Sequence, residues 1–169
     1  MSEPGRVMAG LFALAVLAAC REAEPRRDVV IDYSDRLVGE LLAGTTVEQS
    51  FVSDHDRLCA VAVVVATYGG TPRCKVRFRL RAEGSAAIIS EQVRGCSKIA
   101  DNSAVRFDFP PLVATRGRRL VFSIDSPNGR PGNRVSLWMA SIPGIYPDGA
   151  LSVNGQPVPG ALRFTTFHR

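Results

Sequence analysis

Residues 58–68 read Leu-Cys-Ala-Val-Ala-Val-Val-Val-Ala-Thr-Tyr, and this stretch decides the fold class. It is apolar and rich in β-branched side chains, which is typical of a strand buried on both faces. Gly69, Gly70 and Pro72 follow it and predict that the strand ends there. The sequence therefore predicts a central strand in a β-rich domain.

The stretches around this strand predict further strands and no amphipathic helix. Residues 75–81 alternate strictly between cationic and apolar side chains, the pattern of a strand with one buried face. Asn154-Gly155 is typical of a two-residue hairpin turn. Other strands are expected at 88–93, 105–109, 120–124, 135–139 and 162–167. About eight or nine short strands separated by turn residues favour an all-β sandwich.

The N-terminus predicts an export signal. The apolar run over residues 7–19 is too short to cross a hydrocarbon core, which needs about 20 residues, but has the length of a signal-peptide core. It ends in Leu17-Ala18-Ala19-Cys20, which resembles the lipobox of bacterial lipoproteins. The resemblance implies that residues 1–19 are removed and that Cys20 carries the lipid. An ordinary secretory signal with a chance cysteine and an uncleaved anchor are the alternatives.

A lipidated Cys20 implies a membrane anchor, because two or three acyl chains hold a protein on a bilayer almost permanently. In the lipoprotein pattern, Asp after the lipidated cysteine retains the protein at the inner membrane, and here that position is Arg21. We therefore expect the periplasmic face of the outer membrane, with the outer leaflet of the inner membrane as the alternative.

Composition predicts one domain without a nucleic-acid partner. Removing residues 1–19 takes away Glu3 and Arg6, so the remaining 150 residues keep the formal charge of +5. This modest excess favours acidic glycans or lipid phosphates as partners. Residues 20–44 are expected to be the lipidated cysteine and a tether, because their first part is charged and aperiodic. The sandwich is expected over 45–169.

Three cysteines remain after Cys20, and an odd number indicates one disulfide and one thiol. If Glu83-Gly84-Ser85 turns a hairpin, Cys74 falls nearly opposite Cys96, within reach of a bridge. We therefore expect a Cys74–Cys96 disulfide, with Cys59 as a free, buried thiol.

Motifs for catalysis are absent, so the sequence predicts no enzyme and no cofactor. Of the two histidines, His168 is the penultimate residue, where chains commonly fray. Asp54-His55-Asp56 has two interpretations, a small metal or acid–base site and a hydrated turn. Asp101-Asn102 likewise has two interpretations, a calcium-binding loop and a turn. The turn is favoured in both cases, so no metal ligand set is predicted.

Two groups of residues are candidates for ligand binding. Arg77 and Arg79 belong to a cationic row that could attract an acidic polysaccharide, or that could form a solvated face with acids opposite. Tyr68 and Tyr146 could stack on sugars, although Tyr146 could instead pack its own loop. We expect Trp138 in the core rather than in a binding site.

Several short stretches occur in the order found in a known class of domain. They resemble the jelly-roll, galactose-binding-like β-sandwich modules attached to bacterial membrane proteins and glycosyltransferases of surface-polysaccharide systems. The resemblance spans residues 45–167 and rests on Gln49-Ser50-Phe51, Val65–Tyr68, Asp101-Asn102, Phe107–Leu112, Tyr146–Gly149 and Leu162–Phe164.

The resemblance implies a jelly-roll-like sandwich associated with glycans, and it transfers no catalytic residue. The expected function is a lipid-anchored, non-catalytic envelope module that is carbohydrate-binding-like or accessory to cell-surface polysaccharide. The alternative is a structural lipoprotein that docks another envelope protein through a sheet edge or a loop surface.

Overall fold

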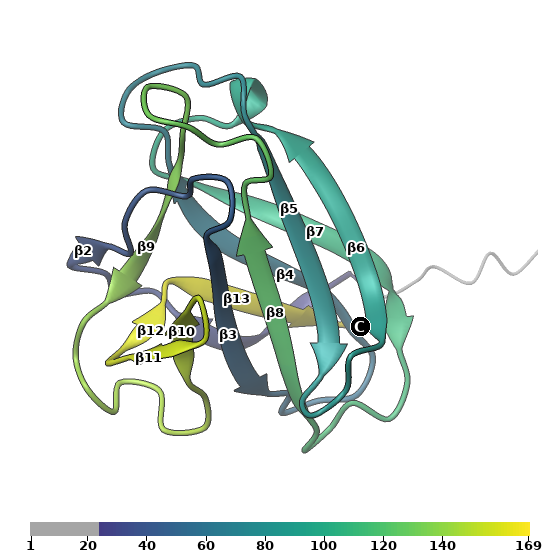
Figure 1. Cartoon of the computed structure of the whole chain (residues 1–169). Coiled ribbons are helices and arrows are strands. Elements are labelled where there is room, and N and C mark those ends of the chain that lie inside the picture. The colour runs from purple at the N-terminus through teal and green to yellow at the C-terminus, as the bar shows by residue number, and fades with distance from the viewer. Residues whose placement is uncertain (1–23) are drawn as a thin grey trace, which may run out of the picture.

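The computed structural model describes residues 24–169 and shows an all-β sandwich of two antiparallel sheets (Figure 1). The predicted signal segment and Cys20 lie outside the described residues. Within the described range, no helix has the length and apolar character needed to cross a membrane.

The first sheet has seven strands and the second has six, counted over the described residues. The first sheet contains β1 (Arg26–Ile31), β2 (Arg36–Leu37), β4 (Leu58–Ala66), β7 (Ser103–Leu112), β9 (Ser136–Ala140), β12 (Ala161–Leu162) and β13 (Phe164–His168). The second runs in the order β11 (Gln156–Val158), β10 (Leu151–Val153), β3 (Thr46–Val52), β8 (Arg119–Asp125), β5 (Lys75–Ala82) and β6 (Ile88–Gly95). A 3-10 turn, η1 (Cys96–Lys98), follows β6.

Phenylalanine side chains fill the core between the sheets. The ring of Phe78 on β5 stacks on that of Phe107 on β7, with centroids 4.6 Å apart, and so joins the two sheets. Val76, Phe78 and Leu80 are fully buried, which confirms the one-faced pattern predicted for 75–81. The burial of such rings is a main source of stability in a domain of this size.

Strand β4 is the central strand predicted from residues 58–68. It pairs with β13 and β9 along one edge and with β7 along the other. Nearly all of its residues are buried, so the prediction of a strand covered on both faces is confirmed. The Asn154-Gly155 hairpin is also present and joins β10 to β11. Both turn residues have positive φ angles, as this tight turn requires.

The sandwich has thirteen strands in the described range, more than the eight or nine expected, because the additional strands are short. Strands of two or three residues, such as β2 and β12, are too short to show a periodic pattern. The sandwich also begins at Arg26 rather than at residue 45. The segment predicted as tether supplies β1, which pairs with β13 and buries Val29 and Ile31.

Strand β7 continues through Pro110 and Pro111, where the sequence predicted its end. Its only strand partner among the described residues is β4, so β7 lies at a sheet edge. Proline is tolerated in edge strands because its missing N–H leaves no central ladder bond unmade.

The direction of β4 defines two ends of the sandwich. The loop before β4 contains His55, and the loop after it contains Tyr68. In Figure 1 the C-terminus lies toward the lower end, whereas the loop from β8 to β9 lies at the upper end. Arg26 pairs with His168, so the start of β1 and the end of β13 lie side by side.

Candidate functional site

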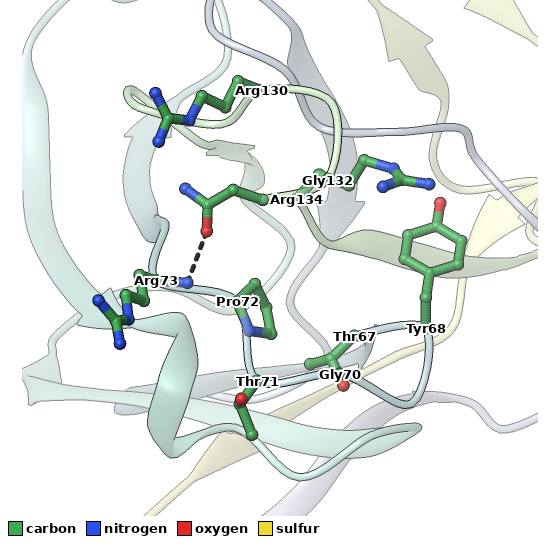
Figure 2. Close-up of a pocket in the computed structure, with 10 residues that line it drawn as sticks. Thr67, Tyr68, Gly70, Thr71, Pro72, Arg73, Arg130, Gly132 and Arg134 are labelled. Carbon is green, nitrogen blue, oxygen red and sulfur yellow. Dashed lines mark hydrogen bonds between the residues drawn. The ribbon is translucent and has the colours of Figure 1, made fainter.

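A cleft of about 410 Å³ lies between two loops at the end of the sandwich that holds Tyr68. One loop follows β4 and the other joins β8 to β9 (Figure 2). Loop sites on a rigid sandwich are common places for binding. The lining residues are Thr67, Tyr68, Gly70, Thr71, Pro72, Arg73, Arg130, Gly132, Asn133 and Arg134.

The turn that carries Tyr68 is fixed by a carboxylate from a neighbouring loop. Asp101 Oδ1 accepts hydrogen bonds from the Thr67 N–H at 2.5 Å and from the Thr67 hydroxyl at 3.2 Å. Its Oδ2 accepts the Gly69 N–H at 3.0 Å. These bonds, led by that of the Thr67 N–H, lower the pKa of Asp101 below its ordinary value. Tyr68 itself has a φ of 57°, a conformation that is uncommon outside glycine.

The opposite wall is tied to the first by two asparagine side chains. Asn133 Oδ1 accepts the Arg73 N–H at 2.6 Å, and Asn128 Oδ1 accepts the Lys75 N–H at 2.8 Å. The Cys74–Cys96 disulfide holds the same segment to the end of β6. Both walls are therefore positioned before any ligand arrives, which lowers the entropic cost of binding.

Three arginines give the cleft its charge. The Arg134 guanidinium lies over the Tyr68 ring, 5.0 Å from its centroid, and also pairs with Glu40. In the described part of the chain, neither Arg73 nor Arg130 has an ion-pair partner. Figure 2 shows the guanidinium groups of Arg73 and Arg130 directed to one side, while Arg134 extends toward Tyr68.

This arrangement combines a flat ring with cationic donors. Tyr68 is 45% exposed, although the Arg134 guanidinium lies over one face of its ring, so the stacking surface for an apolar sugar face is the part of the ring that Arg134 leaves uncovered. Guanidinium groups bind carboxylate, sulfate and phosphate through paired hydrogen bonds. The cleft is therefore suited to a ligand that carries both a ring and an acidic group.

Arg77 and Arg79, the cations predicted to bind a ligand, are occupied by acids on neighbouring strands. Arg77 binds both carboxylate oxygens of Asp125 on β8, at 3.0–3.1 Å. Arg79 Nε donates to Glu91 on β6 at 2.5 Å. This agrees with the second interpretation, a solvated face with acids opposite, and neither Arg77 nor Arg79 lines the cleft.

Tyr146, the other predicted sugar platform, packs its own loop. Its hydroxyl oxygen accepts the Val52 N–H at 3.1 Å, and its ring meets Phe164 edge-on at 5.8 Å. Burial raises its pKa, which fits a phenol held against the sandwich. The loop-packing interpretation of Tyr146 therefore agrees with the structure.

The expectation for Trp138 was wrong. Leu137 and Met139 take the core face of β9, so Trp138 lies on the outer face and is only partly buried. Its Nε1–H donates to Asn102 Oδ1 at 2.7 Å. The side chains of Asp101 and Asn102 thus form hydrogen bonds to the turn at Thr67–Gly69 and to Trp138, which agrees with the turn interpretation.

The cysteine prediction is confirmed. Cys74 and Cys96 form the disulfide, and Cys59 is a free, buried thiol. Burial raises the pKa of Cys59, which makes the thiolate scarce and the residue a poor nucleophile.

No known protein family matches the chain, and no curated protein matches it. Sequence reasoning named Tyr68 but missed its convergence with Arg130 and Arg134. The Pro- and Gly-rich loop that carries these arginines was visible in the sequence, but its position over Tyr68 depends on the pairing of β4 with β9.

Proposed function

We propose that the protein is a lipid-anchored, non-catalytic envelope module of the carbohydrate-binding type, and that its ligand is an acidic glycan. The observation that carries this proposal is the exposed Tyr68 ring beside Arg73, Arg130 and Arg134 in a preformed loop cleft. The resemblance of residues 45–167 to galactose-binding-like modules supports the same class of ligand.

In this proposal the Tyr68 ring stacks on one sugar residue. Arg73 and Arg130 bind the acidic group of that residue or of its neighbour, because no acid in the described chain pairs with them. Arg134 has a positioning role, since it holds the ring and is itself paired with Glu40. Affinity is expected to be modest, because the cleft is open to solvent.

The anchor is the second part of the proposal. A lipid on Cys20 would hold the chain at the end of the sandwich where β1 begins, and the cleft lies at the other end of β4. Such an arrangement would direct the cleft away from the membrane surface. Intact-mass measurement of the mature protein should show cleavage before Cys20 and added acyl mass. A Cys20→Ser protein that is still processed and membrane-bound would contradict the anchor.

The glycan proposal is tested by calorimetric titration with matched acidic and neutral oligosaccharides. We expect the acidic ligand to bind and its affinity to fall as salt is added. The double variant Arg73→Ala/Arg130→Ala should lower that affinity about tenfold or more, since it removes both charge-assisted contacts. Arg116→Ala/Arg118→Ala, which removes two exposed arginines before β8 and so the same net charge, is the matched control and should bind normally.

The proposal fails if no acidic glycan binds, or if the control and Arg73→Ala/Arg130→Ala lose affinity equally. Equal loss would indicate attraction by net charge alone rather than a built site.

A docking function is the second candidate, and the edge strand β6 favours it. Ile88, Ile89 and Val93 on β6 are 43–51% exposed, and β6 ends the six-stranded sheet. An unpaired edge with exposed apolar side chains can accept a strand from a partner. Val93→Lys should abolish co-purification of such a partner while leaving glycan binding intact.

A further inference from the structure

The two histidines of the sequence meet at the end of the sandwich opposite the cleft. The imidazole rings of His55 and His168 are stacked, with centroids 4.1 Å apart. His55 Nδ1 lies 2.7 Å from Asp28 Oδ1. One ligand atom from each of Asp28, His55 and His168 lies within 4.8 Å of the others.

The fold brings these residues together from distant parts of the sequence. Asp28 lies in β1 where its pairing with β13 shifts register, and such an irregularity re-aims a side chain. His168 ends β13 and pairs with both Arg26 and Leu58. His55 lies in the loop just before β4, near the end of the sandwich where β1, β13 and β4 pair through His168.

The polar atoms of the cluster are only partly satisfied. The Asp28 side chain is fully buried, and its Oδ2 accepts the Ser53 hydroxyl at 3.1 Å. His168 Nδ1 is buried and has no hydrogen-bond partner in the described chain. A buried nitrogen without a hydrogen-bond partner is energetically costly. The lone pair or proton of His168 Nδ1 therefore lacks a binding group among the described residues.

We propose that Asp28, His55 and His168 bind a divalent transition-metal ion, with Zn²⁺ as the reference ion. Imidazole and carboxylate are the donors such ions prefer, at about 2.0–2.2 Å. Tetrahedral bonds of that length place the ligand atoms about 3.3 Å apart, whereas the present atoms lie within 4.8 Å of one another. Binding one ion therefore requires the two stacked imidazole rings to turn out of their parallel arrangement and the ligand atoms to draw closer. Three protein ligands leave at least one position for water or another ligand.

The neighbouring Ser53 supports a metal rather than a hydrolytic role. A nucleophilic serine would contact the imidazole ring of a histidine. The Ser53 hydroxyl instead contacts the Asp28 carboxylate and the backbone carbonyl oxygen of His55. Ser53 is also fully buried. In the proposed site it holds the second carboxylate oxygen and so orients Asp28 toward the ion, as outer partners of metal ligands commonly do.

The test is calorimetric titration of the full-length chain, without a histidine tag, with Zn²⁺. We expect saturable binding of one ion per chain. His55→Ala and His168→Ala should each weaken binding about tenfold or more. Asp54→Asn, an exposed acid in the same loop, is the matched control and should bind normally. With Co²⁺ in place of Zn²⁺, the visible bands of a nitrogen- and oxygen-ligated ion should appear in the wild type and be lost in both histidine variants.

His55 is 57% exposed, so His55→Ala is expected to fold even if His168→Ala does not. The thermal midpoint of the wild type should rise with Zn²⁺, and that of His55→Ala should not. Absence of saturable Zn²⁺ binding by the wild type would overturn the proposal. Unchanged affinity in a folded His55→Ala protein would do the same. Neither outcome bears on the glycan proposal, because the two sites lie at opposite ends of β4.

Discussion

The guanidinium carbon of Arg134 lies 5.0 Å from the centroid of the Tyr68 ring, at a turn where Tyr68 has a φ of 57°. An aromatic residue rarely occupies this left-handed region, so the turn holds the ring in place against a conformational cost. The cation above the ring adds a second restraint.

The variant Tyr68→Gly distinguishes the role of the aromatic ring in binding from the role of this residue in the turn. Glycine adopts a positive φ without strain, so the unfolding free energy should change by less than about 1 kcal/mol. Affinity for the acidic glycan should fall about tenfold, because the stacking surface is lost. Urea denaturation and calorimetry measure the two effects. Tyr33→Ala removes another exposed tyrosine and should change neither binding nor the turn.

The disulfide should make a large contribution to stability. It joins residues separated by 22 positions, and closing a loop of that size is worth about 3 kcal/mol through the unfolded chain. Cys74→Ala/Cys96→Ala should therefore lower the urea midpoint substantially. Reduction of the wild type should have the same effect. A midpoint unchanged by both treatments would show that the bridge adds no net stability.

The Arg77–Asp125 pair should contribute more stability than the Arg79–Glu91 pair. The Asp125 side chain is 8% exposed and binds Arg77 through both oxygens, whereas Glu91 is 45% exposed. Asp125→Asn should cost about 2 kcal/mol of unfolding free energy, and Glu91→Gln should cost clearly less, because its charge is exposed to solvent. Chemical denaturation compares the two. Glycan affinity should survive both changes, and its loss in either would return the β5 face to consideration as a binding surface.

Asp101 should make stability depend on pH in the acid range. Its pKa is lowered in the folded protein by hydrogen bonds from Thr67 and Gly69, so its ionised form stabilises the fold above the ordinary value of 3.8. That contribution is lost as the pH falls through the lowered pKa. Asp101→Asn should be less stable than the wild type at neutral pH, and the difference should shrink in acid. A difference independent of pH would argue against a role for the charge.

The sandwich could be predicted from sequence because its long strands carry strong local patterns. In residues 58–66 and 75–81 the order of apolar and charged side chains indicates which positions are buried. The disulfide followed from one hairpin, since Lys75 pairs with Gly95 and leaves Cys74 beside Cys96. A short strand such as β2 depends on its pairing with β9, and the local sequence of two residues carries no pattern that predicts this pairing.

The candidate sites depended on long-range pairing and were mostly missed. The Arg77 row looked free because its acids, Asp125 and Glu91, come from other strands. His168 looked like a frayed end because the sequence does not show that β1 covers β13. Trp138 was misplaced because alternation alone does not say which face of a strand is buried.

The pairing of β1 with β13 also has a mechanical consequence. β1 runs in the same direction as β4, from the His55 end toward the Tyr68 end, because each is antiparallel to β13. A pull on a bound glycan, resisted by an anchor before Arg26, would act along the axis of β1. The hydrogen bonds between β1 and β13 would then be loaded in shear. These backbone bonds and the bond from the Val29 N–H to Thr166 Oγ1 would bear the force at the same time, instead of breaking one after another.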